Sequence, residues 1–159
     1  MDRPPNNRSF SVGSLAVPST WDAFTELRLI EPPSPGLGVP MAMQPDKPSM
    51  RASLMIVCEK GAPGDLGGGL KEFLAEFSAY VQQYKEIESG EMLFDDGATG
   101  YFSKISFEAL PGLLTLQYHV VRPHGEQVVH MTASLAYREK HKLESEIIPL
   151  IRSYQPPVD

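Results

Sequence analysis

The longest patterned segment of the sequence is LLTLQYHVVRPHGEQVVHMTASLAY, in which apolar and polar residues alternate on both sides of a Pro-His-Gly-Glu turn. Such alternation is typical of two antiparallel strands, and a glycine after a polar residue favours a tight turn between them. We therefore expect a hairpin over residues 113–137 with the dipeptide His124-Gly125 at its tip. In that register His119 lies directly opposite His130.

The alternation gives the predicted hairpin two faces of different character. One face is aliphatic and should join the core; its pairs are Val120/Val129, Tyr118/Met131, Leu116/Ala133 and Leu114/Leu135. The other face is half-polar; its pairs are His119/His130, Gln117/Thr132 and Thr115/Ser134. We interpret this half-polar face either as an ordinary outer sheet face or as a binding surface.

Two opposed histidines could begin a zinc or copper site. Such a site needs three or four protein ligands, and the half-polar face offers no nearby Cys, Asp or Glu. We therefore expect neither a metal nor another cofactor. A metal-dependent enzyme would depend on this histidine pair alone.

Composition restricts the partners and the compartment. The chain has 159 residues, enough for one domain, and 42% of them are hydrophobic, enough for a sizeable core. A net charge of −6 without a basic cluster disfavours nucleic acid and anionic membrane surfaces as partners. The single cysteine, Cys58, excludes an internal disulfide and is expected in a buried strand. The N-terminus lacks the pattern of a signal peptide and no apolar run reaches transmembrane length, so we expect a cytoplasmic protein without membrane insertion.

The first sixty residues predict strands separated by irregular chain. Residues 1–9 are polar and proline-containing and are expected to form a flexible arm. Strands are expected at residues 9–18, 23–30 and 51–59. Between the last two lies a tract rich in proline and methionine, residues 31–50, which cannot be regular structure. Its methionines either pin the loop to the domain or offer adaptable apolar binding; they are Met41, Met43 and Met50.

Two later segments have helical periodicity. The first carries Leu70, Phe73, Leu74, Phe77, Val81 and Tyr84. The second, near the C-terminus, carries Leu143, Ile147, Leu150, Ile151 and Tyr154, and Pro149 should kink it or end its first part. Between them, EMLFDD and TGYFSKISFEA predict a strand pair closed by a glycine turn. This order is typical of an α+β domain with a largely antiparallel twisted sheet packed with helices, spanning residues 10–155 and followed by a tail at 156–159.

Catalytic signals are weak. The glycines of GDLGGGLKEF precede a helix but match neither the phosphate-loop nor the dinucleotide pattern, so a flexible connector is expected. Asp95 and Asp96 could be paired carboxylates, but aspartates before glycine more often form a turn. His141 is expected to be solvated at a helix start. Because no nucleophile, base and orienting group come together, we expect a protein that is not an enzyme.

The arrangement resembles the DcrB-like proteins. The similarity rests on the Pro-x-x-Trp ending of the first strand (Pro18 to Trp21), on SLMIVCE, on the helix LKEFLAEFSAYVQQY, on DGATGYFS, on the long hairpin and on the final IRSY. It covers about residues 9–154. The resemblance implies a PsbP-like fold. Because a signal peptide and lipobox are lacking, it points to the cytoplasmic branch, the effector-associated chaperones of type VI secretion. The proline- and methionine-rich loop is longer than this resemblance implies.

What the resemblance implies is a non-catalytic adaptor chaperone. Chaperones of this branch are homodimers whose concave sheet surface holds the N-terminal transmembrane helices of an effector until it is loaded on the secretion spike. Such a groove needs apolar surface and a few polar groups. Its expected residues are Met55, Val57, Phe102, Thr115, Gln117, His119, His130 and Thr132, with Ser106 beside them. The alternative is a small PsbP-like module that binds another protein or a small ligand.

Overall fold

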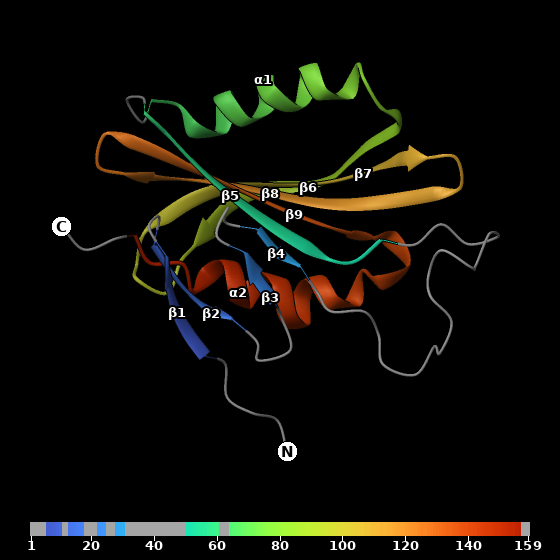
Figure 1. The fold of residues 1–159 in the computed structure, drawn as a ribbon. Helices are drawn as coiled ribbons and strands as arrows, with labels where there is room; N and C mark the ends of the chain where they lie inside the picture. Colours follow the sequence, from blue (N-terminus) through green and yellow to red (C-terminus); the bar gives the residue numbers. More distant parts are fainter. Residues whose placement is uncertain are drawn as a thin grey trace.

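The computed structural model describes residues 6–10, 13–17, 22–24, 28–30, 50–60 and 64–156. A seven-stranded antiparallel sheet in the order β3-β4-β5-β9-β8-β7-β6 forms its centre (Figure 1). The strands are β3 Asp22–Phe24, β4 Arg28–Ile30, β5 Ser53–Lys60, β6 Gln82–Leu93, β7 Thr99–Leu110, β8 Leu113–His124 and β9 Gln127–Ala136. A separate two-stranded sheet pairs β1 Asn6–Phe10 with β2 Gly13–Val17.

Helices cover both faces of the large sheet. Helix α1, Leu66–Ser78, lies across one face, and the C-terminal helical segment lies against the other (Figure 1). That segment consists of a 3₁₀ turn at Tyr137–Glu139, a π-helical turn at Leu143–Ile147 and α2 at Ile148–Arg152. The larger core lies between the sheet and the C-terminal segment, and a smaller core lies beneath α1. The predicted α+β class with a largely antiparallel sheet is confirmed.

The β8–β9 hairpin is confirmed, but its register differs from the predicted one. His119 pairs with Thr132 and not with His130, because the turn residues are Gly125 and Glu126. Gly125 has φ +57°, so the glycine supplies the left-handed conformation at the first turn position. A slide of two positions leaves each side chain on its predicted face. The exception in burial is Leu114, which was expected in the core and is 38% exposed.

Helix α1 begins earlier and ends earlier than predicted. The stretch GDLGGG is not a flexible connector, because Asp65 caps the helix by accepting a hydrogen bond from the Gly68 amide at 2.9 Å. The first turn also lies close to the sheet: a Cβ at Gly67 would stand 3.2 Å from the ring of Tyr101. After Ser78 the chain turns into β6, so Tyr84, predicted on the helix, belongs to a strand.

The N-terminal predictions need correction where the structure describes them. Residues 6–10 form β1, so the expected arm over 1–9 is partly a strand. The single strands expected at 9–18 and 23–30 are instead pairs of short strands, β1/β2 and β3/β4. The proline- and methionine-rich tract lies outside the described residues except for Met50. The thioether of Met50 accepts a hydrogen bond from Thr115 Oγ1 at 3.6 Å, which fits the pinning interpretation for that residue.

The C-terminal segment buries the apolar stripe that the sequence predicted. All five of its residues, Leu143, Ile147, Leu150, Ile151 and Tyr154, are at most 2% exposed. The irregularity expected at Pro149 takes the form of the π-helical turn directly before α2. Proline has no N–H to donate to the preceding turn, and its ring needs room there, so a widened turn accommodates it.

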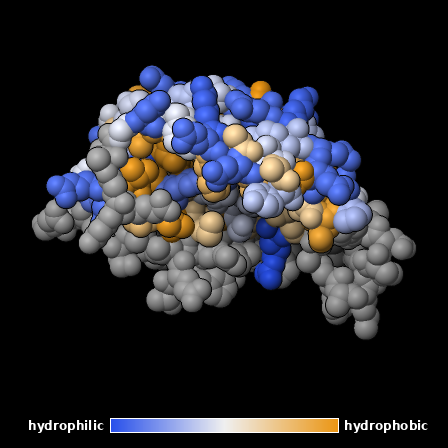
Figure 2. Space-filling view, turned by 90° about the horizontal axis from the view of Figure 1, so that it is seen from above, coloured by the Kyte–Doolittle hydropathy of each residue, from blue (hydrophilic) through white to orange (hydrophobic). Residues whose placement is uncertain are grey.

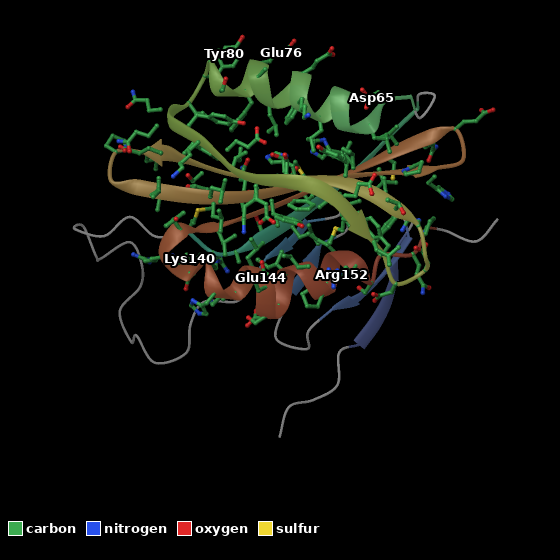
Figure 3. All side chains as sticks on the ribbon, turned by 180° about the vertical axis from the view of Figure 1, so that it is seen from behind. Asp65, Glu76, Tyr80, Lys140, Glu144 and Arg152 are labelled. Atoms are coloured by element: carbon green, nitrogen blue, oxygen red, sulfur yellow. The ribbon has the colours of Figure 1, made fainter. Side chains whose placement is uncertain are left out.

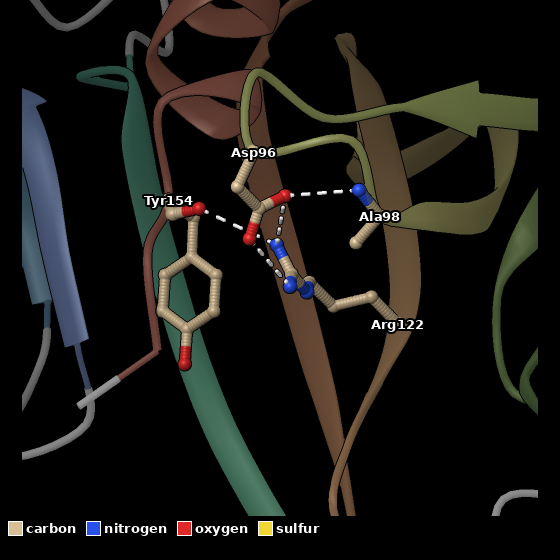
Figure 4. Close-up of polar contacts among 4 residues, drawn as sticks. All are labelled: Asp96, Ala98, Arg122 and Tyr154. Atoms are coloured by element: carbon tan, nitrogen blue, oxygen red, sulfur yellow. Dashed lines mark hydrogen bonds and ion pairs between the residues drawn. The ribbon is translucent and has the colours of Figure 1, made fainter. Parts of the chain in front are cut away.

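A buried arginine joins the hairpin to two other segments (Figure 4). Arg122, on β8, is 3% exposed and forms an ion pair with Asp96 at 2.9 Å. Its guanidinium lies 4.5 Å from the ring centroid of Phe94 and donates to the backbone oxygen of Tyr154 at 3.4 Å. Burial alone would raise the pKa of Asp96, but hydrogen bonds from Arg122 and from the Ala98 amide, together with the arginine charge, lower it below its usual value. Asp96 therefore has the expected turn role and also neutralises Arg122.

Replacing Asp96 should expose how much the fold depends on this pair. Asp96→Ala leaves the Arg122 charge buried without its carboxylate and should lower the free energy of unfolding by about 2–4 kcal/mol. Asp95→Ala is the matched control, since the carboxylate that holds Arg122 belongs to Asp96 and not to Asp95, and it should change stability by no more than about 0.5 kcal/mol. Urea denaturation measures both. Equal losses for the two variants would contradict the assigned role of Arg122.

Candidate functional site

The half-polar face of the hairpin lies beneath α1 and is not an open outer face. His119 and Thr115 are each 2% exposed. The ring of Phe73, on α1, lies 5.8 Å from that of His119 and 5.3 Å from that of His130. Phe77, one turn later, lies 6.5 Å from His119. The expectation that this row faces solvent is therefore wrong at its centre.

The polar side chains of this face form a directed hydrogen-bond chain. Because the Gln117 Oε1 atom can only accept, His119 Nε2 donates to it, at 2.8 Å. His119 Nδ1 then accepts from His130 Nε2 at 3.1 Å. At the other end Gln117 Nε2 donates to Ser134 Oγ at 3.1 Å. We name this set, His130, His119, Gln117 and Ser134, the polar relay.

The relay requires a neutral His119. Burial lowers the pKa of His119 from 6.5 to about 3, and the charge of His130 acts in the same direction. The neutral ring can accept one hydrogen bond and donate the other, which is what its two neighbours need. Thr132 Oγ1 lies between the two rings, 3.4 Å from His119 Nδ1 and 3.5 Å from His130 Nε2.

The same contacts account for the histidine pair without a metal. Both nitrogens of His119 are engaged, one with Gln117 and one with His130. Among residues 50–60 and 64–156 no group of three or more His, Cys, Asp or Glu side chains is arranged to hold an ion. The pair fits a hydrogen-bonded packing unit, and the residues around it supply no third ligand.

Beside the relay, three large apolar side chains reach the surface. Met55 and Val57 on β5 are each 39% exposed, and Phe73 on α1 is 45% exposed. Met55 pairs with Thr132 and Val57 with His130, so β5 continues the half-polar face beyond the cover of α1. We name these three residues the β5–α1 strip. Figure 2, which looks onto the α1 side, shows hydrophobic surface emerging between the hydrophilic residues there.

The predicted groove residues divide into three groups. Met55 and Val57 are in the strip, with His130 and Thr132 half-buried beside them. His119, Gln117 and Thr115 lie deeper, in or next to the relay. Phe102 and Ser106 are on the opposite face: Phe102 pairs with Val120 and stacks on Tyr118 at 5.1 Å. The prediction failed for Phe102 because it assumed the wrong phase for β7.

Sequence reasoning missed the exposure of Phe73. Its spacing with Leu70, Leu74 and Phe77 placed it on the buried face of the helix. The structure buries Leu70 and Leu74 and leaves Phe73 at the edge of the contact. No signal in the sequence distinguishes these positions, because which edge of the apolar stripe is left open depends on where α1 crosses the sheet.

Cys58 occupies β5 as predicted, but it is half-buried and not fully enclosed. It packs against the larger core, on the face opposite Val57. Burial raises the pKa of its thiol, and the hydrogen bond with Tyr154 opposes this only in part. A thiol whose pKa is raised is a poor nucleophile at neutral pH, so Cys58 acts here as a packing residue.

Known structures share this fold at low sequence identity. A Pseudomonas aeruginosa protein of unknown function, PA94, superposes with TM-score 0.63 at 11% identity, covering 99% of this chain and 100% of that one. Mycobacterium tuberculosis LpqN, involved in cell envelope biogenesis, gives TM-score 0.61 at 15% identity, with 98% and 87% covered. The Saccharomyces cerevisiae Ran-binding protein Mog1p gives 0.57 at 8% identity, with 96% of each chain covered.

These likenesses concern the fold alone: the α+β architecture with a largely antiparallel sheet is shared with PA94, LpqN and Mog1p. No family model matches the sequence, and a search of curated proteins returned no match. In the part of the chain that the structure describes, no helix is long and apolar enough to cross a membrane.

The neutral relay predicts a pH-dependent stability. Below pH 6.5 unfolded His119 takes up a proton that the folded chain resists until about pH 3, so the unfolded state binds more protons in this window. The contribution is complete above pH 6.5 and is lost as pH falls. Lowering the pH from 7.5 to 5.5 should remove about 1.4 kcal/mol through His119.

Urea denaturation at both pH values, with His119→Gln as the comparison, measures this contribution. Glutamine does not titrate, and the other histidines are common to both proteins, so the variant should lose less stability over the same interval. A variant that loses as much as the parent protein would show that His119 is not the group responsible.

Proposed function

We propose that this chain is a non-catalytic adaptor chaperone that binds apolar helical segments of a partner protein. The partner is an effector of type VI secretion with N-terminal transmembrane helices, held in the cytoplasm before it is loaded on the spike. The class of partner comes from the resemblance to the DcrB-like chaperones. The α+β fold and its neighbours are compatible with a small binding module of this kind.

The observation that carries the proposal is the β5–α1 strip. Scattered exposed hydrophobic residues are ordinary, but this strip brings side chains from two separate elements together on one face. An amphipathic or apolar helix could lay its side chains against Met55, Val57 and Phe73. His130 and Thr132, half-buried at the margin, could meet polar groups that such a helix carries.

The rigidity of the strip favours binding as well. Phe73 is held by its ring contacts with both relay histidines, and α1 is fixed by the smaller core beneath it. Met55 and Val57 project from a strand paired along its whole length with β9. Side chains that are ordered before binding lose less conformational freedom when a partner arrives.

The absence of catalysis is part of the proposal. Among the described residues, His119 is the histidine whose pKa is lowered most strongly. It is enclosed beneath α1, and both of its ring nitrogens are hydrogen-bonded. The nearest thiol lies on the opposite face of β5, with a raised pKa. Groups in these states can stabilise a fold but are poorly placed to transfer a proton or attack a substrate.

A charge in the strip should abolish binding of the client. Val57→Glu places a carboxylate against an apolar helix without a partner, and its desolvation costs several kcal/mol on binding. Because Val57 is 39% exposed, the free protein should remain folded. The measurement is co-purification of the effector fragment carrying its N-terminal helices, together with thermal unfolding of the variant.

Leu93→Glu is the matched control. Leu93 is 63% exposed and lies on the edge strand β6, which β9, β8 and β7 separate from β5. This variant should retain the client. Undiminished co-purification by a folded Val57→Glu protein would refute the assignment of the strip.

We expect a homodimer, because the strip of one copy is shorter than the client helix that it would hold. Met55 and Val57 span about 7 Å along β5, whereas a transmembrane helix is about 30 Å long. One copy therefore covers only part of such a client, and two copies would enclose more of it. Light scattering at micromolar concentration should return about twice the 17.6 kDa mass of one chain. A monomer both with and without the client would contradict this expectation.

A further inference from the structure

A pocket opens on the face of the sheet opposite the β5–α1 strip. It has a volume of about 380 Å³ and lies between the β6–β7 end of the sheet and the C-terminal helical segment. Leu116 and Leu143, each 2% exposed, form an apolar floor. Figure 3, seen from behind, shows Lys140 and Glu144 on that segment, on the side of the sheet away from α1.

The walls of the pocket add further apolar surface. Ile87, on the edge strand β6, is 40% exposed although it lines the pocket. Tyr137 contributes its ring from the 3₁₀ turn that follows β9. A pocket of this size with an aliphatic floor and an aromatic wall can take the chain or ring of a small organic molecule.

The charges of the lining favour an anion. The lining holds two lysines, one glutamate and His141, an excess of at least one positive charge until Glu88, which pairs with Lys104 from outside the lining, is counted; the whole chain has a net charge of −6. Lys140 Nζ lies 5.4 Å from the centre of the Tyr137 ring, and among the residues that the structure describes it has no carboxylate partner. Lys104 is bound to Glu88 at 3.3 Å. The Lys104 side chain is only 18% exposed, whereas that of Glu88 is 60% exposed and can turn outward.

We infer that this pocket binds a medium-chain monocarboxylate, with its apolar chain on Leu116 and Leu143 and its carboxylate between Lys104 and Lys140. The anion would replace Glu88 as the partner of Lys104. This site is independent of the proposed chaperone function, because it uses the other face of the sheet.

The test uses octanoate, with 1-octanol as the neutral molecule of equal chain length. Each is titrated into the full chain at pH 7.5 and followed by amide chemical shifts. Octanoate should bind at least about tenfold more tightly than octanol, since only the anion gains charge-assisted hydrogen bonds. The shifts should change around Leu116, Leu143 and Tyr137, and not around Met55, Val57 and Phe73.

Variants that remove single charges should change the octanoate affinity in opposite directions. Lys104→Gln and Lys140→Gln should each weaken octanoate binding about three- to tenfold. Glu88→Gln should strengthen it about twofold or more, because Lys104 loses its competing partner. Lys71→Gln, an exposed lysine on α1, is the matched control and should change nothing.

Three results would overturn the inference. The first is equal affinity for octanoate and octanol, or no binding of either. The second is a set of shift changes centred on the β5–α1 strip. The third is an octanoate affinity that is unaffected by both lysine variants.

Discussion

The burial of both faces of the β8–β9 hairpin is the constraint on which the rest of the structure depends. One face is almost entirely aliphatic and is covered by the C-terminal helical segment. The other is half-polar and is covered by α1. In a sheet buried on both sides each unpaired polar group costs about 1–3 kcal/mol, and among the described residues only Ser103 Oγ and Arg122 Nε are buried without a hydrogen-bond partner. The composition of each face therefore decides what may cover it.

The polar relay is the solution on the α1 side. His119 is enclosed, yet each of its nitrogens has a partner, and the chain of donors ends on the Ser134 hydroxyl. Phe73 and Phe77 then provide the aromatic surface over the ring. On the opposite side Arg122 is buried, and its two terminal nitrogens donate to Asp96 and to the backbone oxygen of Tyr154. Both devices tie β8 to a segment distant in sequence.

The sequence predicted much of the fold because its strongest patterns are local. The alternation of residues 113–137 identified the hairpin and both of its faces, and the 3.6-residue spacing identified the C-terminal stripe from Leu143 to Tyr154. The predicted register of the hairpin is wrong by two positions. Both His124-Gly125 and Gly125-Glu126 are plausible turn residues, and the alternation of apolar and polar residues is the same in either case. The predicted start of α1 is too late, because the glycines of GDLGGG are typical of a segment that interrupts a helix. In the structure the N-cap hydrogen bond to Asp65 allows the helix to begin before them.

The candidate site was predictable only in part, because it depends on what covers the sheet. Strand alternation correctly grouped Met55 and Val57 with His130 and Thr132. It could not indicate that α1 would cross over His119, nor that Phe73 would remain at the edge of that crossing. Phe102 was placed on the wrong face because the sequence does not give the register of β7 against β8, in which Phe102 pairs with Val120.

Stability alone does not explain the residues of the strip. The outward positions of β5 alternate with Leu54 and Ile56, which are buried, so the strand could carry polar side chains at 55 and 57 without loss to the core. It carries methionine and valine there instead. Val57 and Met55 stand next to half-buried polar residues and near an exposed phenylalanine from another element. A surface composed in this way is costly to leave in water and gains by being covered, which is the physical condition for a binding face.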